Sequence, residues 1–426
     1  MRPIGIDLFA GAGGLSLGFE QAGFDVAAVV EIDPIHCAVH EYNFPETATI
    51  CRDVSKLTGS EIREIAKLGS REIDVVFGGA PCQGFSLIGH RALDDPRNAL
   101  VGHFARIVFE LQPKYFVFEN VRGLTIGTHK RFLEEVIVEF EANGYNVLRK
   151  YEVLNAAEYG VPQDRRRLFL LGARTGHVLP AYPARRTRLP RPYKRLELSD
   201  LPATPTVADA LGDLPDLMQC DELFETETFH TELGKPSGYA KQLRGLVRAP
   251  DDYSYTRLYD AASLTGCLRT RHTPLSVKRF RSTKPGKVEP VSRFLKLDPA
   301  GVSNTLRAGT NSDKGAFTSP RPIHPYEPRC ITNREAARLH SYPDWFRLHM
   351  TKWHGFRQIG NSVPPMLARA VGAQIITALG VKPSVPKRAL KPGDPSLLEF
   401  DTKTAARRFG VREDINGRRL RIERQG

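Results

Sequence analysis

Short apolar runs alternate with amphipathic segments between Ile4 and Leu171, and this alternation constrains the fold more than any other feature of the sequence. The apolar runs predict five buried strands: Ile4 to Phe9, Val26 to Ile32, Ile73 to Phe77, Tyr115 to Phe118 and Leu168 to Leu171. The segments between them predict helices: Leu15 to Ala22, Ile35 to Tyr42, Glu61 to Leu68, Phe104 to Leu111 and Phe132 to Ala142. Such an order is typical of an α/β fold in which helices cover both faces of a mostly parallel, doubly wound sheet.

The alternation ends near Val178, where Pro- and Arg-rich sequence begins, and charge then becomes the main feature. We end the first domain at residue 185 and expect residues 186–328 to form a smaller inserted region. Within it, residues 207–232 are acidic and Thr265 to Arg321 are strongly basic. The acidic residues of that basic stretch are Glu289, Asp298 and Asp313, and the basic ones are Arg269, Arg271, Lys278, Arg279, Arg281, Lys284, Lys287, Arg293, Lys296, Arg307, Lys314 and Arg321. The whole chain has a net charge of +13, which favours a polyanionic partner such as nucleic acid.

Helical periodicity returns after the basic stretch, over Arg334 to His340 and Met366 to Leu379. A loop is expected between them at Gln358 to Pro365. We therefore expect residues 329–380 to return to the first domain and complete it. Residues 381–426 are basic, contain proline and have little apolar periodicity, so they predict a loosely held C-terminal extension.

The cysteines and the apolar content narrow the setting of the protein. The chain begins without the apolar run of a signal peptide and contains no stretch of about 20 apolar residues that could span a membrane, so we expect a cytoplasmic protein with no membrane partner. The six cysteines form no CxxC pair, which argues against a disulfide framework and against a zinc site. No metal is expected, and one cysteine could instead be reactive.

A glycine-rich segment from Asp7 to Gly14 follows the first predicted strand and opens a helix, where a nucleotide-like ligand binds in folds of this type. Glu31 ends the second strand and could accept hydrogen bonds from ribose hydroxyls. Asp53 follows a third apolar stretch and could bind an adenine amino group. A dinucleotide fingerprint would need glycine at Ser16, so the segment alone is also compatible with a tight turn that binds nothing.

Gly78 to Ser86 place a cysteine, Cys82, in a Gly- and Pro-rich loop after the predicted strand from Ile73 to Phe77. Cysteine performs covalent chemistry as the thiolate, which nearby helix N-termini or cations favour. A single cysteine is more often an inert buried thiol, and only the neighbouring motifs favour reactivity here.

Glu119 follows the predicted strand from Tyr115 to Phe118, within Phe118-Glu119-Asn120-Val121. A partly desolvated carboxyl with a raised pKa can donate a proton to a ring nitrogen, although a helix cap or a structural ion pair is equally compatible with the sequence. Arg165 and Arg167 alternate before the next strand and are expected to share a face, unless they belong to a solvated charged loop.

Taken together and in this order, these motifs resemble the cytosine-5 DNA methyltransferase family, of the bacterial restriction-modification type. The resemblance extends from about residue 4 to residue 378 and includes two further segments, Arg334 to Asp344 and Gln358 to Pro365. Its most specific elements are Pro81-Cys82-Gln83, Glu119-Asn120-Val121, Gln163-x-Arg165-x-Arg167 and Gly360-Asn361-Ser362-Val363-Pro364. The departures are small: His340, Tyr342 and Ser362 stand where other residues are commoner in the family.

The resemblance implies a Rossmann-like catalytic domain that binds S-adenosyl-L-methionine as methyl donor, with residues 186–328 as the target-recognition region. The implied donor-binding residues are Phe9, Ala10, Gly11, Gly13, Glu31, Ile32, Asp53, Val54, Pro81, Leu100, Asn361 and Ser362. The implied catalytic residues are Cys82, which adds to carbon 6 of cytosine, Glu119, which binds ring nitrogen 3, and Arg165, which contacts the base oxygen and steadies Glu119. The implied DNA-binding residues are Gln83, Ser86, Arg97 and Arg167, with the loop from Gly84 to Leu100 closing over the DNA.

The resemblance also implies that the target cytosine leaves the duplex stack, because its ring cannot be reached inside the helix. Duplex DNA is the expected partner of a monomer that is nucleoid-associated when bound, with a cognate restriction endonuclease acting separately. Three alternatives remain open: a tRNA cytosine methyltransferase of the same fold, a catalytically silent DNA-recognition subunit, and, more weakly, a nicotinamide-dependent oxidoreductase. The basic insert favours duplex DNA, and the presence of both Cys82 and Glu119 argues against a silent subunit.

Overall fold

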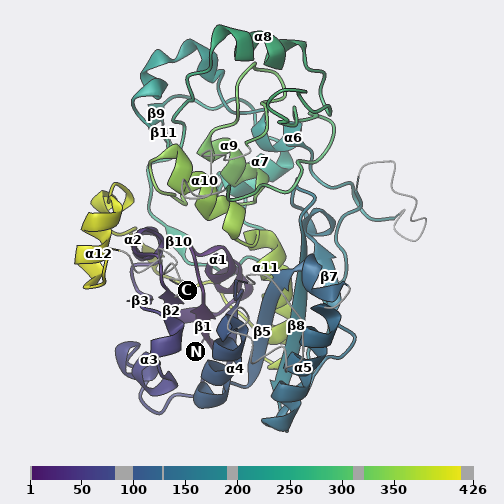
Figure 1. Cartoon of the computed structure of the whole chain (residues 1–426), viewed down its shortest axis with the longest axis vertical. Helices are drawn as coiled ribbons and strands as arrows, with labels where there is room; N and C mark the ends of the chain where they lie inside the picture. The colour runs from purple at the N-terminus through teal and green to yellow at the C-terminus, as the bar shows by residue number, and fades with distance from the viewer. Residues whose placement is uncertain (1, 82–98, 127–128, 190–199, 310–320, 414–426) are drawn as a thin grey trace, which may run out of the picture.

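A central eight-stranded sheet forms the lower lobe of the molecule (Figure 1). The computed structural model describes residues 2–81, 99–126, 129–189, 200–309 and 321–413. The strand order is β3-β2-β1-β4-β5-β8-β6, with β7 paired to β8 beside β6. The strands are β1 (Ile4–Leu8), β2 (Asp25–Glu31), β3 (Ala48–Cys51), β4 (Val75–Gly78), β5 (Tyr115–Val121), β6 (Tyr145–Val147), β7 (Glu152–Asn155) and β8 (Arg166–Arg174).

The five strands from β3 to β5 in this order are parallel, whereas β8 runs antiparallel to β5, β6 and β7. This arrangement confirms the predicted α/β class and the mostly parallel sheet. Neither β6 nor β7 was predicted from the sequence, because strands of three or four residues are too short to show a period.

Helices cover both faces of the sheet, and the alternation of buried side chains along each strand divides the core into two layers. On β5, Tyr115 and Val117 face one apolar cluster while Phe116 and Phe118 face the other. The helices are α1 (Gly14–Ala22), α2 (Pro34–Asn43), α3 (Gly59–Ile65), α4 (Ala99–Leu111), α5 (His129–Ala142) and α11 (Pro365–Ala378).

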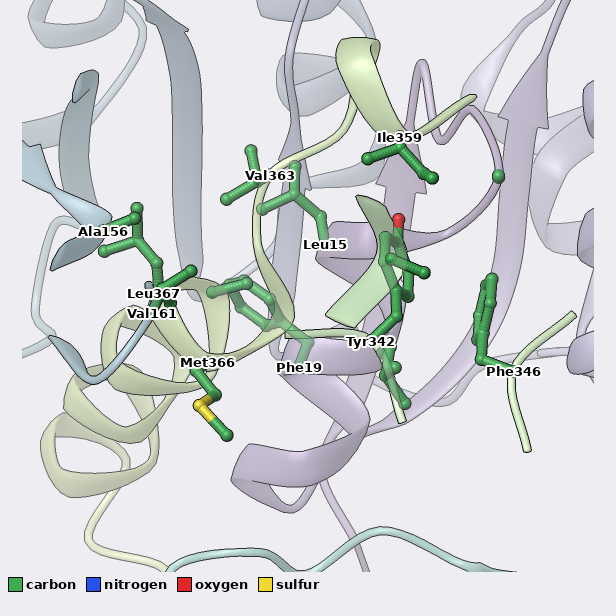
Figure 2. Packing of buried hydrophobic residues seen from close by; sticks show 14 of the residues in the cluster. Leu15, Phe19, Ala156, Val161, Tyr342, Phe346, Ile359, Val363, Met366 and Leu367 are labelled. Atoms are coloured by element: carbon green, nitrogen blue, oxygen red, sulfur yellow. The ribbon is translucent and has the colours of Figure 1, made fainter. Parts of the chain in front are cut away.

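The return segment packs into the first of these layers (Figure 2). Leu15 and Phe19 of α1 pack with Val363, which precedes α11, and with Met366 and Leu367 in its first turn. The two helices approach so closely that a Cβ added to Gly18 of α1 would lie 2.2 Å from the Cβ of Ala368 in α11. Residues more than 340 positions apart therefore share one core.

The upper lobe in Figure 1 contains short elements joined by irregular chain. These are α6 (Val207–Leu211), β9 (Phe229–His230), α7 (Gly238–Leu243), β11 (Ser263–Leu264), α8 (Pro274–Ser282), α9 (Asn333–Leu339) and α10 (Lys352–Asn361). The short strand β10 (Thr256–Arg257) lies lower, beside α1 and α2 (Figure 1). Small apolar clusters, such as the one that contains Phe280, Ile323 and Cys330, hold parts of this lobe together. None of the helices in the described ranges combines the length and apolar composition that a membrane span requires.

Two expectations about the C-terminal third were wrong. Gln358 to Asn361 form the last turn of α10 and are not part of a loop. The extension is also well packed as far as the structure describes it: β12 (Ala389–Leu390) pairs with β10, and α12 (Thr402–Phe409) lies against α2. Leu397 and Leu398 are buried in the main core, so apolar burial holds the extension although its sequence shows little periodicity.

Candidate functional site

The loop between β1 and α1 is shaped by backbone conformations that few side chains tolerate. Phe9, Gly11 and Gly13 have φ angles of 63°, 56° and 100°. The Glu31 carboxylate fixes this loop to the end of β2, because it accepts hydrogen bonds from the N–H groups of Gly11 at 2.8 Å, Ile32 at 2.9 Å and Asp33 at 2.8 Å. Glu31 therefore joins the carboxyl ends of two neighbouring strands.

Two glycines of this loop differ in what surrounds them. A Cβ built on Gly11 would have no heavy atom within 4 Å, whereas one built on Gly14 would lie 2.4 Å from the carbonyl oxygen of Val363. Gly14 is needed for packing against the return segment, and Gly11 borders open space. The open side of the loop, next to a fixed carboxylate, is suited to a ligand with hydroxyl groups.

The other expected donor-binding residues lie around the same end of the sheet. Asp53 accepts a hydrogen bond from the N–H of Ser55 and so begins the turn that contains the buried Val54. Arg106 of α4 donates to the Val54 carbonyl at 2.8 Å, which ties this turn to the helix that carries Leu100.

The remaining members of the expected set come from two further segments. Pro81 is exposed just after β4, and Asn361 is exposed at the last position of α10. Ser362 caps that helix and is half-buried. The return segment thus contributes residues to the same end of the sheet as the loop after β1.

Glu119 lies at the end of β5 and forms an ion pair with Arg167 of β8. The two side chains are 11% and 13% exposed, and Nε of Arg167 lies 2.9 Å from Oε1 of Glu119. Burial raises the pKa of Glu119 above its ordinary value, and the charges of Arg167 and Arg165 offset only part of this effect. The site therefore holds a carboxyl group that keeps its proton to a higher pH than an exposed glutamate.

The chain that leads to Cys82 passes beside this carboxyl. A Cβ on Gly79 would lie 2.4 Å from Oε2 of Glu119, and Nδ2 of Asn120 donates to the carbonyl of Ala80 at 3.1 Å. Cys82 itself lies outside the described residues. So do the expected DNA-binding residues Gln83, Ser86 and Arg97, together with all of the expected closing loop except its last two positions.

The resemblance implied that Arg165 steadies Glu119, but within the described residues Arg165 forms no ion pair with it. Its guanidinium is completely buried and donates to three backbone carbonyls: Nη1 to Leu306 at 2.9 Å, and Nη2 to Gly360 at 2.8 Å and Ser362 at 2.6 Å. Arg167 takes the place beside the carboxylate. With three carbonyls bound, Arg165 connects β8 to the inserted region and to the return segment.

The three departures from the family pattern contact one another. Nε2 of His340 lies 3.0 Å from Oγ of Ser362, and the His340 and Tyr342 rings are stacked with centroids 5.8 Å apart. Nδ1 of His340 lies 3.0 Å from Nε2 of Gln163. Burial lowers the pKa of His340 well below its ordinary value, so the ring is neutral. It packs between Gln163 of the arginine motif and Ser362 of the return segment.

A buried polar chain beneath the loop was not found from the sequence. Asp7 is completely buried, accepts a hydrogen bond from Oγ of Ser16 at 2.6 Å, and has a second oxygen without a partner in the described residues. Ser16 in turn lies 3.1 Å from Nε2 of His40. Burial raises the pKa of Asp7 well above its usual range, with Glu31 and Glu119 adding to the effect. Ser16, noted only as a missing glycine, was the available indication of this chain.

Several cations of the basic stretch serve the fold. The guanidinium of Arg269 lies 4.2 Å from the ring centroid of Phe224, and Nζ of the buried Lys296 donates to the carbonyl of Phe280 at 3.1 Å. Arg279 pairs with Glu289 at 3.3 Å.

Other cations of the same stretch remain available to a partner. Six residues are exposed and form no ion pair within the described ranges: Lys278, Arg281, Lys284, Lys287, Arg293 and Arg307. Lys314 lies outside those ranges. The number of basic residues in the sequence thus overstates the positive surface that this stretch presents.

Comparisons with known proteins agree with this geometry. The model of the C-5 cytosine-specific DNA methylase family matches residues 4–377. Type II methyltransferase M.XorII of Xanthomonas oryzae pv. oryzae (strain KACC10331 / KXO85) is 61% identical over 420 residues, which cover 99% of this chain and 95% of that protein. Type II methyltransferase M1.HphI of Haemophilus parahaemolyticus is 32% identical over 376 residues, which cover 87% of this chain and 86% of the other.

A solved structure shows the same fold at a similar level of identity. A crystal structure assigned as a DNA modification methyltransferase encoded within a prophage, from E. coli, superposes with a TM-score of 0.70 at 34% identity, covering 89% of this chain and 99% of that one. The family model spans every motif described above, from the loop after β1 to α11. The chain therefore belongs to the C-5 cytosine-specific DNA methylase family.

Proposed function

We propose that this protein transfers a methyl group from S-adenosyl-L-methionine to carbon 5 of cytosine within a specific duplex DNA sequence. The observation that carries the proposal is the buried Glu119 carboxyl, whose raised pKa, fixed position and closeness to the chain before Cys82 suit proton donation to a flipped base. The family of the chain supports the same reaction.

The loop after β1 fits the methyl donor. Glu31 uses its oxygens to bind backbone N–H groups, and the remaining lone pairs can accept hydrogen bonds from ribose hydroxyls. Phe9, Ala10, Gly11 and Gly13 would hold the methionine part, and the adenine would lie near Ile32, Asp53 and Val54, with Pro81, Leu100, Asn361 and Ser362 around it. When bound, the donor supplies an electrophilic methyl group on a sulfonium.

Carbon 5 of cytosine is too weak a nucleophile to accept a methyl group until the ring is activated. In the proposed mechanism, the Cys82 thiolate forms a bond to carbon 6 while Glu119 donates its proton to nitrogen 3, so that carbon 5 becomes enamine-like. Carbon 5 then attacks the methyl group, whose bond to sulfur breaks and leaves a neutral thioether. Loss of the carbon 5 proton to a water base and cleavage of the bond between Sγ and carbon 6 then restore the ring, and Glu119 recovers its proton from nitrogen 3.

The contacts suggest different roles for the two arginines of the Gln163-x-Arg165-x-Arg167 motif. Arg167, which forms an ion pair with Glu119, would hold that carboxyl and contact the base oxygen, the role that the resemblance implied for Arg165. Arg165 would act as a positioning residue, because its guanidinium is buried and donates to three backbone carbonyls.

We further propose that the protein modifies DNA as part of a restriction-modification system. Both sequence relatives described above are named Type II methyltransferases. The protein would act as a monomer on duplex DNA, and a separate endonuclease would cleave the same site when it is unmethylated.

Bisulfite sequencing of DNA from cells that express the protein tests the reaction and maps the target site. Purified protein should then methylate a duplex with that site, and Cys82→Ala should abolish methyl transfer. A duplex with 5-fluorocytosine at the target should trap a denaturation-resistant adduct, because fluorine cannot leave as a proton. An adduct that maps to Cys37, Cys51 or Cys330, or methyl transfer to tRNA in place of duplex DNA, would contradict the proposal.

A further inference from the structure

One of the exposed cations lies on a segment that the catalytic end of the sheet holds in place. Arg307 is exposed and forms no ion pair within the described parts of the chain. The backbone polar groups of its neighbour Leu306 are both bound by the arginine motif: the N–H donates to Oε1 of Gln163 at 3.2 Å, and the carbonyl accepts from Nη1 of Arg165 at 2.9 Å.

Additional bonds fix the chain on the N-terminal side of Arg307. Oγ1 of Thr305 donates to the carbonyl of Asp164 at 2.7 Å, and the N–H of Asp164 donates to the carbonyl of Ser303 at 2.8 Å. Ser303 and Leu306 are buried. The segment before Arg307 is therefore held along its length by the residues that precede β8.

The backbone of Arg307 also lies against the last turn of α10, which leads into Asn361 and Ser362 of the expected donor site. A Cβ on Gly360 would lie 2.5 Å from the carbonyl carbon of Arg307 and 2.3 Å from the nitrogen of Ala308, so no side chain fits between the two segments. The carbonyl of Gly360 binds the same Arg165 guanidinium as Leu306 does. The Cα of Arg307 is thus fixed relative to both Asn361 and the pair formed by Glu119 and Arg167.

We propose that Arg307 binds a DNA backbone phosphate that flanks the target cytosine and holds the strand while the base is flipped. This inference rests on the proposed function and adds a positioning residue for it. A flipped base requires its strand to stay in a rotated conformation, and a cation on a rigid segment can hold that conformation without first being ordered itself.

The chemistry of the side chain favours phosphate. A guanidinium without a carboxylate partner presents a planar fork of donors that matches two oxygens of one phosphate. The exposed cations of α8 cannot take this role, since α8 lies at the far end of the upper lobe while β5 and β8 lie in the lower lobe (Figure 1). Those cations can contact only DNA that is remote from the flipped base.

The test couples Arg307 to individual phosphates. After bisulfite mapping, duplexes with the mapped site would carry a single neutral methylphosphonate at each position around the target cytosine. Binding would be measured for wild type, Arg307→Gln, Arg307→Lys and the matched control Arg281→Gln on α8. Wild type should lose about tenfold in affinity at one of the two phosphates that flank the target.

Arg307→Gln should bind the unmodified duplex about tenfold more weakly than wild type does, and it should lose nothing more at that phosphate. Arg307→Lys should recover part of the affinity, and Arg281→Gln should keep the full flanking-phosphate effect. The inference would be overturned if the methylphosphonate weakened DNA binding of Arg307→Gln by the same factor as it weakens binding of wild type. It would also be overturned if Arg307 were coupled only to a remote phosphate. An Arg307→Gln effect that disappears on 7-deazaguanine DNA would overturn it too, because it would indicate a base contact. If bisulfite sequencing shows methylation but Arg307 is not coupled to a flanking phosphate, only the role of Arg307 is rejected. If no methylation is found, the proposed function is rejected as well.

Discussion

Two buried glutamates of this protein, Glu119 and Glu335, have pKa values shifted in opposite directions. Glu119, at the end of β5, has one ion pair, and burial keeps its pKa above the ordinary value. Glu335, near the start of α9, is also buried, and burial alone would raise its pKa, but Arg329, His324 and hydrogen bonds from Thr332 lower it to about 2. The difference indicates that Glu335 serves the fold as a permanent anion, while Glu119 is kept able to hold a proton.

The partners of Glu335 account for a cluster that resembles a metal site. His324, Glu327 and Glu335 have ligand atoms within 4.8 Å of one another. Arg329 already forms an ion pair with each carboxylate, with Nε 2.6 Å from Glu327 and Nη2 2.7 Å from Glu335. His324 accepts a hydrogen bond from the N–H of Glu327 at 3.0 Å. A guanidinium occupies the position that a cation would need, so we interpret the cluster as structural.

The largest expected effect is on the chemistry of Glu119. Glu119→Gln should lower the rate of methyl transfer about 10²- to 10⁴-fold, because the proton donor to nitrogen 3 is lost. In wild type the rate should fall as the pH rises through the raised pKa of Glu119, since the carboxyl then loses its proton, and the variant should lack this dependence. Single-turnover rates across the pH range measure both effects.

The stability of Glu119→Gln is the control for that result. The ionised carboxylate is disfavoured by burial, so its replacement by a neutral amide should leave the free energy of unfolding unchanged or slightly higher. A strongly destabilised variant would mean that Glu119, like Glu335, stabilises the fold as an anion, and it would contradict the difference drawn between the two residues.

Glu335→Gln should have the opposite profile, with a loss of stability and little change in the rate per folded molecule. Removal of one partner leaves the buried Arg329 charge incompletely paired, at an expected cost of about 3–5 kcal/mol in the free energy of unfolding. Chemical denaturation at neutral pH measures this cost, and Glu225→Gln, which removes a pair between exposed side chains, is the matched control.

The same residue predicts an acid dependence. The depressed pKa of Glu335 means that its stabilisation is present above its ordinary value of 4.5 and is lost as the pH falls toward about 2. The difference in unfolding free energy between wild type and Glu335→Gln should therefore shrink in acid. A difference that stays constant down to pH 2 would show that Glu335 is not held ionised by Arg329.

Leu398→Ala tests whether the C-terminal extension stabilises the fold, as Glu335 is expected to do. Leu398 is fully buried and its carbonyl accepts a hydrogen bond from the N–H of Met350 at 3.1 Å. We expect a loss of about 2–5 kcal/mol in the free energy of unfolding. Leu275→Ala, at a position that is 62% exposed, should change stability little. Equal stability of the two variants would mean that the extension is dispensable for the fold.

The smallest expected effect concerns the exposed cations. Lys278→Gln should weaken DNA binding only about twofold to threefold and reduce the slope of log affinity against log salt by about 1, because one phosphate contact is lost. Lys296→Met should destabilise the fold and leave that slope unchanged, since Lys296 binds the carbonyl of Phe280. Titrations at several salt concentrations compare the two. If the slope of log affinity against log salt were unchanged in both variants, Lys278 of α8 would not contact a DNA phosphate.

The sequence by itself determined the layered α/β fold and the positions of the motifs. Every predicted strand coincides with an observed one to within three residues at either end, because strands buried on both faces appear in the sequence as continuous apolar runs. Glu31 and Glu119 were also found from sequence, since each is a carboxylate that ends an apolar run and so lies at the same edge of the sheet.

Only the tertiary structure decided what each charge does. Arg165 and Arg167 alternate in the sequence and look equivalent, yet the pairing of β5 with β8, which sets Val121 opposite Arg167, brings Arg167 to Glu119, and the inserted region supplies the Leu306 carbonyl to Arg165. The partner of each of these buried charges lies far away in the sequence, 48 residues away for Glu119 and Arg167 and 141 residues away for Arg165 and Leu306. A local pattern has no access to such contacts, and the free energy of a charge depends on them.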